Sequence, residues 1–366
     1  MNRDLQTEFL TLHEFVAAAR QRLDDNGWDY IIGGAETETT VKRNRQALDA
    51  IALRPRVLRD VSAIDCTAML FGKPARLPVL LAPVGGLETC DPDGAVAAAR
   101  GAGSFGIPVM TSSVSKRSKA EIRAATASPA LFQLYVRGGG RFIEDHVEAA
   151  IAAGLEAFCL TVDTAHYSRR ERDIANRFDK PWRAGVDAAA RQNQARLSWA
   201  DVARIRKAYD IPLILKGIAT PEDARIAVDH GVEVIYVSNH GGRQLDHGLG
   251  AMDVLPEIVA AVAGRATIIV DGGISRGTDI VKAIALGADA VGIGRLYCYA
   301  LATAGPDGIV RMLEILEDEV TAALGLLGVT CLADLNPSYL HHGAPVVSTP
   351  SALSVFPLLG PEDDGR

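Results

Sequence analysis

A short polar cluster after an apolar run holds the residues best suited to acid–base chemistry. Residues 234–237 are β-branched or aromatic, as in a buried strand, and Ser238-Asn-His-Gly-Gly-Arg243 follows directly. His240 can accept a proton near neutral pH, and Arg243 can hold a carboxylate through two parallel hydrogen bonds. The two glycines between them allow a tight turn. A polar loop without a catalytic role would also explain so short a motif, so the rest of the chain must decide.

Polar residues follow most of the other apolar runs as well. A buried Lys, Asp or Gln inside an apolar strand costs several kcal/mol unless it is paired, so residues of this kind at many strand ends imply one shared polar ligand. These strand ends are Pro83-Val-Gly-Gly86, Ser112-Ser113, Gln133 with Tyr135, Thr161 with Asp163, Lys216, Ser238 to Arg243, Asp271-Gly-Gly273 and Gly294-Arg295.

The elements that must position these residues alternate between strand and helix. Helical stretches are predicted to start near Asp93, Lys116, Arg141, Trp199, Pro221, Asp253, Arg276 and Pro306. Alternation predicts parallel pairing, and eight units close into a (β/α)₈ barrel whose strand ends share one rim. An open doubly wound sheet is the alternative, but no G-x-G-x-x-G follows the first strand. The eight predicted strands are Val79–Ala82, Pro108–Thr111, Leu131–Leu134, Ala157–Val162, Leu213–Leu215, Val234–Val237, Thr267–Val270 and Ala290–Ile293.

Glycine-rich turns after the last two strands favour a phosphate site. Asp-Gly-Gly-Ile-Ser-Arg-Gly277 and Gly-Ile-Gly-Arg295 place glycine amides and an arginine where barrels of this kind bind phosphate, next to a helix N-terminus. The phosphate could belong to a cofactor or to a substrate. Glycines needed only for tight turns are the alternative explanation.

Three segments are predicted around this organisation. Residues 1–75 form an N-terminal helical extension packed on the barrel, in which Thr11 and Glu14 make a capping box. Residues 76–340 form the barrel, with a mobile, partly helical loop around 176–197 over its mouth. Residues 341–366 form a C-terminal tail. His341 and His342 lie there without nearby acidic or cysteine partners, so no metal site is predicted.

Composition excludes several classes of protein. Of 366 residues, 48% are hydrophobic and 23% charged, which allows a large core. The net charge of −7, with no basic run interleaved with aromatics, argues against a nucleic-acid partner. Five scattered cysteines without a C-x-x-C spacing indicate reduced thiols. No signal sequence and no membrane span are apparent, so a soluble cytoplasmic protein is expected.

With these motifs in view, the chain resembles the FMN-dependent 2-hydroxy acid oxidase and dehydrogenase family, which includes glycolate oxidase, lactate oxidase and mandelate dehydrogenase. The resemblance extends from about Leu12 to about Leu335. It is carried by Ser238 to Asp246 and by five further motifs that match in order: Gln-Leu-Tyr135, Thr-Val-Asp-Thr164, Arg169-Arg170, Leu-Lys-Gly217 and Asp-Gly-Gly-Ile-Ser-Arg-Gly-Thr-Asp279.

The resemblance implies a role for each reactive residue. His240 would be the base that takes a proton from the substrate, with Asp163 behind it to stabilise the imidazolium. Arg243 and Arg170 would hold the substrate carboxylate, and Tyr135 would hydrogen-bond the substrate. Lys216 would lie beside the flavin, where its charge stabilises the reduced ring. The FMN site would be lined by Pro83, Val84, Gly85, Ser112, Gln133, Thr161, Lys216 and Ser238, with Asp271, Gly273, Arg276, Gly294 and Arg295 at the phosphate end.

Three departures from the family pattern bear on the substrate. Trp28 is aligned with a tyrosine that helps hold the carboxylate, so it is assigned to substrate binding here. Val114 replaces a tryptophan of the pocket, and Ser275 replaces an arginine that reaches the FMN phosphate. The loop around 176–197 is also shorter than in glycolate oxidase.

These departures favour an (S)-2-hydroxy acid larger than glycolate, or an aromatic one, oxidised to the 2-keto acid. A cyclic 2-hydroxy ester such as L-pantolactone is the first alternative. A different phosphate-binding barrel enzyme and a non-catalytic flavin protein are more remote alternatives. The electron acceptor could be oxygen, a quinone or a carrier protein, and the tetramers of relatives imply a homotetramer.

Overall fold

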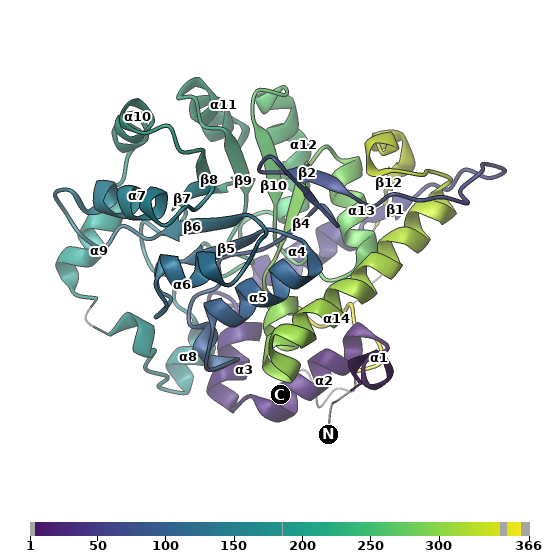
Figure 1. Ribbon diagram of the computed structural model, residues 1–366, viewed down its shortest axis with the longest axis horizontal. Helices are drawn as coiled ribbons and strands as arrows, with labels where there is room; N and C mark the ends of the chain where they lie inside the picture. Colours follow the sequence, from purple (N-terminus) through teal and green to yellow (C-terminus); the bar gives the residue numbers. More distant parts are fainter. Residues whose placement is uncertain (1–3, 185, 345–349, 360–366) are drawn as a thin grey trace.

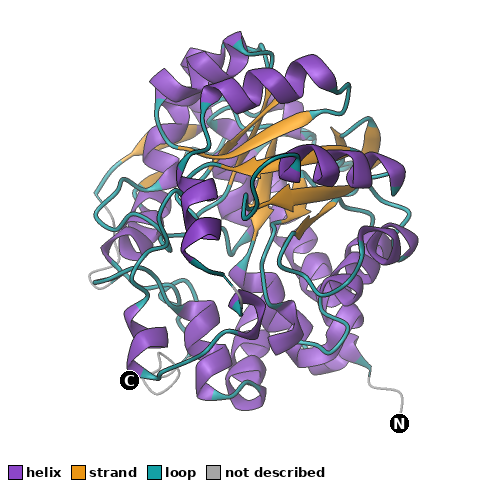
Figure 2. Ribbon diagram, turned by 90° about the vertical axis from the view of Figure 1, so that its left-hand side faces the viewer, coloured by secondary structure: helices purple, strands orange, loops and turns teal. Residues whose placement is uncertain are grey.

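Eight parallel strands close into a barrel at the centre of the molecule. The computed structural model describes residues 4–184, 186–344 and 350–359. Figure 2 shows the strands surrounded by helices, so the predicted (β/α)₈ fold is confirmed. The barrel strands are β4 (Val79–Leu81), β5 (Val109–Ser112), β6 (Ala130–Leu134), β7 (Ala157–Thr161), β8 (Leu213–Ile218), β9 (Val234–Val237), β10 (Thr267–Val270) and β11 (Ala290–Ile293).

Closure of the barrel brings all eight strand ends to one rim. The ring is complete because β4 pairs with both β5 and β11, and every neighbouring pair is parallel. Small and medium side chains from alternate positions, such as Leu80, Leu131 and Ile214, fill the interior. The interior core excludes water below the rim, so the polar residues near the carboxyl ends of the strands can face a ligand only on that side.

Helices cover the outside of the barrel, as Figure 1 shows. The last of them begins at Arg295, directly after β11, and not only at Pro306 as predicted. Ala304 and Gly305 have non-helical dihedral angles, so a kink separates its two parts, and Pro306 opens the second. The covering helices are α5 (Ala95–Phe105), α6 (Lys119–Ala124), α7 (Phe142–Ala152), α10 (Trp199–Ala208), α11 (Pro221–Asp229), α12 (Ala251–Val262), α13 (Gly277–Ala285) and α14 (Arg295–Leu327).

The N-terminal segment is mainly helical and contains α1 (Leu5–Glu8), α2 (Leu12–Arg22), α3 (Asp25–Ile32) and α4 (Thr39–Asp49). The predicted capping box of Thr11 and Glu14 is present at the start of α2. This segment also contains β1 (Ile51–Leu53) and the hairpin of β2 (Ala68–Leu70) and β3 (Lys73–Ala75). None of the helices in the described ranges is long and apolar enough to cross a membrane.

The C-terminal segment returns to the N-terminal one. Strand β12 (Leu340–His342) pairs antiparallel with β1, so the expected boundary at residue 341 falls inside a strand. Further on, Leu353 and Phe356 are buried, and the Phe356 ring meets His13 of α2 edge-on. The predicted tail therefore packs on the body of the molecule over its described part.

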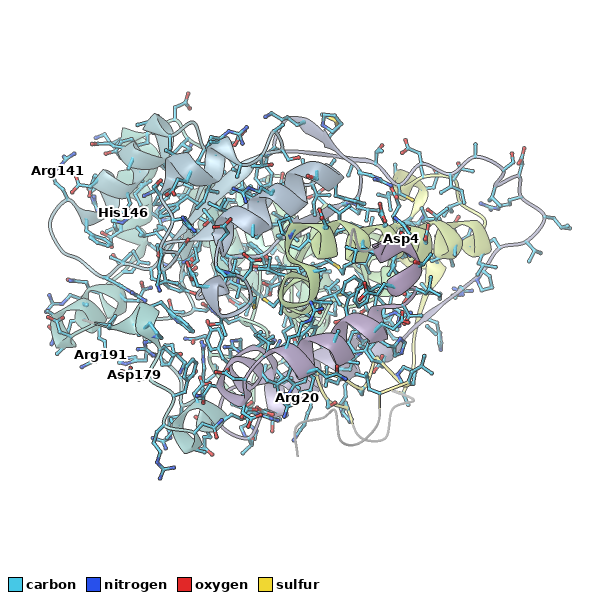
Figure 3. All side chains as sticks on the ribbon, turned by 60° about the horizontal axis from the view of Figure 1, so that its bottom comes forward. Asp4, Arg20, Arg141, His146, Asp179 and Arg191 are labelled. Atoms are coloured by element: carbon cyan, nitrogen blue, oxygen red, sulfur yellow. The ribbon has the colours of Figure 1, made fainter. Side chains whose placement is uncertain are left out.

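The loop between β7 and α10 contains short helical pieces, as predicted. These are α8 (Glu171–Ala175), η2 (Pro181–Arg183) and α9 (Ala188–Ala195). Figure 3 shows Arg191 and Asp179 of this loop at one edge of the molecule. Gln194 of α9 is buried, and its amide joins Val136 N to Thr161 O, so the loop is fastened to the barrel rim. We call residues 176–197 the lid segment.

Candidate active site

A large cavity lies at the rim formed by the strand ends. Its volume is about 250 Å³, counted as the space open to the centres of water molecules. By the same measure, a cavity for one buried water needs roughly 10–15 Å³. The structure thus brings together most of the predicted site residues. Those that line the cavity are Pro83, Val84, Gly85, Tyr135, Arg170, Lys216, His240, Arg243, Asp271, Gly273, Gly294 and Arg295.

His240 is held between a carboxylate and a phenol. Its Nδ1 lies 3.1 Å from Asp163 Oδ1, and its Nε2 lies 3.3 Å from the hydroxyl of Tyr135. Because an ionised carboxylate can only accept a hydrogen bond, Nδ1 carries the proton and Nε2 is left as the acceptor that faces the cavity. His240 has a φ of 60°, and its backbone N–H donates to Ser238 Oγ at 3.0 Å. This turn directs the ring back over the rim.

The charges around His240 set its protonation state. Burial lowers the pKa of His240, and Asp163 opposes that effect only in part. Burial alone would raise the pKa of Asp163, but His240 and then Lys216 outweigh it and hold the pKa below its usual range. Burial raises the pKa of Tyr135, so its phenol stays protonated. At neutral pH the group therefore consists of a neutral base, an ionised partner and a hydroxyl donor.

Arg170, which is buried, and Arg243, which is partly buried, are two cations beside this base. Arg243 Nη1 donates to the carbonyl of Gly33 at 2.7 Å, and its guanidinium lies 4.9 Å from the centre of the Tyr30 ring. Arg170 Nε donates to the carbonyl of Arg243 at 3.3 Å. Burial, followed by repulsion from Arg170, lowers the pKa of Arg243 to about 10. No carboxylate of the described residues lies within 4.0 Å of either arginine, so the pair is arranged to receive an anion.

Lys216 forms a buried network with its neighbours on the next strands. Its Nζ donates to Ser238 Oγ at 2.8 Å, and Ser238 Oγ donates to Asp271 Oδ1 at 2.6 Å. Lys216 Nζ also lies 3.2 Å from Asp271 Oδ2. Burial alone would lower the pKa of Lys216, but Asp271 and then Asp163 raise it. The lysine therefore keeps its positive charge at the floor of the cavity.

Buried polar atoms without partners mark the place of a further ligand. Ser112 Oγ donates to Gln133 Oε1 at 2.7 Å, whereas Gln133 Nε2 and Thr161 Oγ1 are buried without a hydrogen bond to any described residue. Such groups are costly unless a ligand satisfies them. The predicted residues Ser112, Gln133, Thr161 and Ser238 all lie at or next to strand ends, although none of the four is itself among the residues that line the cavity.

The glycine turns leave space at the other end of the cavity. Gly272 and Gly273 have φ values of 110° and 90°, which side chains rarely adopt. A Cβ added at Gly294 would meet nothing closer than 4.0 Å, so the backbone there is open to a ligand. These turns suit a phosphate group, and the two ends together fit a phosphorylated polar ring such as FMN.

The predicted site residues that do not line the cavity are Trp28, Ser112, Gln133, Thr161, Asp163, Ser238 and Arg276. Trp28 is fully buried against Tyr299, with ring centres 5.6 Å apart. Tyr30 lines the cavity in its place and donates its hydroxyl to the carbonyl of Gly85 at 2.9 Å. Residues two apart on a helix point about 200° apart, so only one of the two can face the rim. The structure therefore places Tyr30, and not Trp28, on the cavity wall.

Arg276 also lies away from the cavity lining. It caps the start of α13 and forms an ion pair with Glu319 of α14, which also accepts a hydrogen bond from Gly277 N at 2.6 Å. Its guanidinium is thus directed to a neighbouring helix, and Ser275 before it lines the cavity. Arg295 does line the cavity, but its guanidinium donates to the carbonyls of Ile31, Gly33 and Gly241.

Further lining residues come from segments whose position the sequence does not reveal. The lid segment contributes Trp182, Arg183 and Arg191, and the C-terminal segment contributes Ser351 and Ala352. Only the aromatic and basic content of the lid sequence could have indicated such a role. The tail residues carry no comparable signal.

The barrel and its rim combine the features of one class of enzyme: a (β/α)₈ fold, a histidine backed by a carboxylate beside two arginines, and glycine turns that suit a phosphate. The model of the FMN-dependent dehydrogenase family matches residues 19–342 of this chain. The chain therefore belongs to the FMN-dependent dehydrogenase family, its cofactor is FMN, and it is an oxidoreductase that acts on CH–OH groups.

Similar proteins cover nearly the whole chain. It is 39% identical to an L-lactate oxidase of a Nostoc species, over 91% of this chain and 98% of that protein. It is 38% identical to glycolate oxidase 1 of Oryza sativa subsp. indica, over 94% and 98%. A crystal structure of mandelate oxidase superposes with a TM-score of 0.85 at 40% identity and covers 93% of this chain and 100% of that one.

Proposed function

We propose that this protein oxidises an (S)-2-hydroxy acid larger than glycolate to the corresponding 2-keto acid. The observation that carries the proposal is the placement of His240, backed by Asp163, in one cavity with the unpaired cations Arg170 and Arg243. A base and a carboxylate clamp in one cavity suit an acid with a hydroxyl on the neighbouring carbon. The relatives named for lactate, glycolate and mandelate support the same substrate class.

Each side chain would then have one task. Arg170 and Arg243 bind the substrate carboxylate, which orients the hydroxyl toward His240 and Tyr135. His240 Nε2 accepts the hydroxyl proton while the carbonyl forms, and Asp163 stabilises the resulting imidazolium. FMN supplies the two-electron acceptor for the hydrogen that leaves the substrate carbon. The Tyr135 hydroxyl stabilises negative charge on the substrate oxygen.

The cofactor would be held by residues of the floor and of the glycine turns. Gln133 and Thr161 have free polar atoms for the ring, and Lys216 provides a positive charge that favours the reduced, anionic form. Gly273 and Gly294 leave room for the phosphate.

The cavity wall supports a substrate larger than glycolate. Val114 packs against Gly85, where an added Cβ would lie 2.4 Å from Val114 Cγ2, and the rest of the wall near it is formed by Tyr30 and Trp182. A valine leaves more space than an aromatic residue would. A neutral lactone would leave the buried guanidinium groups without an anion, so an acid is favoured over a cyclic ester.

Anaerobic reduction of the bound flavin tests the proposal. The purified holoenzyme should lose its visible flavin absorbance when (S)-2-hydroxy acids of increasing size are added, and the (R) enantiomers should have little effect. Reduction by L-pantolactone alone would favour the lactone alternative, and no reduction by any compound would favour a flavin protein without this activity. Admission of air, or addition of a quinone, then identifies the acceptor; oxygen is expected, since the named relatives are oxidases.

A further inference from the structure

The cavity wall carries more positive charge than the proposed reaction uses. Arg170 and Arg243 suffice for one carboxylate, and Lys216 lies at the flavin floor. Three more arginines, Arg137, Arg183 and Arg191, also line the cavity. No carboxylate of the described residues lies within 4.0 Å of any of these three guanidinium groups. The whole chain has a net charge of −7, so this local excess does not follow from composition.

Arg137 extends the line of residues that begins with Tyr135. Tyr135 and Arg137 line the cavity, whereas Val136 between them is buried in the opposite direction. Tyr135 follows β6 directly, and residues two apart in a strand lie roughly 6–7 Å apart on the same face. Arg137 is therefore one step further from the base, toward the mouth of the cavity.

Arg183 reaches the same region from the lid segment. Arg137 Nη1 donates to the carbonyl of Trp182 at 3.3 Å, which places the two arginines near each other. The Arg183 guanidinium lies 3.4 Å from the centre of the Tyr167 ring, and Arg170 lies 4.5 Å from the same ring centre. A positive strip thus runs from the carboxylate clamp across Tyr167 to the lid. We call Arg137 and Arg183 the outer pair.

Two cations that lie close together repel each other unless a negative charge lies nearby, and no carboxylate of the described residues lies within 4.0 Å of the outer pair. Burial lowers the pKa of Arg137, and repulsion from Arg183 contributes to the shift. Burial would raise the pKa of Tyr167, but Arg170 and then Lys180 outweigh it and lower that pKa. Aromatic ring faces attract neighbouring cations and so reduce the repulsion between Arg137 and Arg183, but only an anion neutralises their charge.

We propose that the substrate is a 2-hydroxy acid with a second anionic group at its far end, bound by the outer pair with Arg191 at the rim. This inference rests on the proposed function, since the first carboxylate must occupy Arg170 and Arg243. The step from Tyr135 to Arg137 suits a dicarboxylic acid of about five or six carbons. Contacts between the second anion and Arg183 would also hold the lid segment over the cavity while substrate is bound.

Matched pairs of acids test the inference. The rate constant kcat/KM for anaerobic flavin reduction should be at least about tenfold higher for 2-hydroxyglutarate than for 2-hydroxypentanoate, and likewise for 2-hydroxyadipate against 2-hydroxyhexanoate. In Arg137→Gln and Arg183→Gln this ratio should fall toward one. Arg196→Gln is the matched control, because Arg196 is an exposed arginine of the same lid segment that does not line the cavity; its ratio should equal that of the wild type.

Product binding separates recognition from turnover. Calorimetry on the holoenzyme should show at least about tenfold tighter binding of 2-oxoglutarate than of 2-oxopentanoate, with the difference lost in Arg137→Gln. Equal rates and affinities for diacid and monoacid would overturn the inference and leave the proposed function standing. If neither acid of any pair reduces the flavin, the proposed function fails and the inference fails with it.

Discussion

The proposed proton acceptor of the site is a single side chain, His240. His240 Nε2 faces the cavity, and among the described residues its hydrogen-bond partner is the phenol of Tyr135, which stays protonated. We expect His240→Gln to lower kcat by roughly 10²- to 10⁴-fold, the usual contribution of a positioned base. FMN content, measured from the absorbance of the purified protein, is the control and should not change. Turnover close to that of the wild type would assign the base elsewhere.

The pH dependence of the rate follows from the surroundings of His240. Burial lowers its pKa below 6.5, and the base must be neutral to accept a proton. The value of kcat/KM should therefore be constant near neutral pH and fall only as the pH drops through that lowered pKa. Asp163 opposes the shift, so Asp163→Asn should move the acid limb to still lower pH and reduce the rate. If kcat/KM already began to fall well above pH 6.5 as the pH is lowered, this assignment of the base to His240 would be contradicted.

At the scale of elements, the N-terminal helices belong to the site because buried ions join them to the barrel. Arg45 of α4 lies 2.9 Å from Asp279 of α13, and their side chains are only 4% and 1% exposed. Removing one partner leaves a buried charge unpaired. We expect Arg45→Met to lower the free energy of unfolding by about 3–5 kcal/mol in a denaturant titration.

A surface ion pair provides the control for that measurement. Arg20 lies 3.1 Å from Asp25, whose side chain is 82% exposed. Arg20→Met should change the free energy of unfolding by at most about 1 kcal/mol. Similar losses for the two variants would mean that the pair of Arg45 and Asp279 does not fasten α4 to the barrel.

The sequence predicted the barrel elements better than the elements around them. Apolar runs of four to six residues, each followed by a helical pattern, identified all eight barrel strands because both faces of such strands are buried. The sequence did not show that Tyr30, and not Trp28, faces the cavity. Trp28 was chosen because it aligns with a tyrosine of the family, whereas the face of α3 that points to the rim decides which residue lines the cavity. Arg137 and Arg183 could not be placed, since their proximity depends on the path of the lid segment.

At the scale of the whole molecule, cofactor and fold should stabilise each other. Gln133 and Thr161 have buried polar atoms without a partner among the described residues, and the site for FMN exists only in the folded chain, so FMN should bind the folded chain far better than the unfolded one. FMN at 100 times its Kd should raise the free energy of unfolding by about 2.7 kcal/mol, measured with the cofactor-free protein as reference. Riboflavin, which lacks the phosphate, should give a smaller increase. Equal effects would argue against a phosphate site at Gly273 and Gly294.

Other properties of the whole molecule stay predictions. A homotetramer and a cytoplasmic location are among them. The choice among oxygen, a quinone and a carrier protein depends on surfaces around the flavin and on kinetics. These properties arise between molecules, so the polar pattern of the strand ends does not encode them.

The carbonyl of Gly33 anchors both Arg243 and Arg295, which lie 210 and 262 residues further along the chain. During synthesis, Gly33 therefore leaves the ribosome long before Arg243 and Arg295 have been added to the chain. During synthesis the early helices must wait without these contacts until the last barrel strand has emerged. FMN binding is then one of the last steps in the folding of each newly made chain. A chain arrested before residue 295 should not bind FMN and should lack the yellow colour of the flavin.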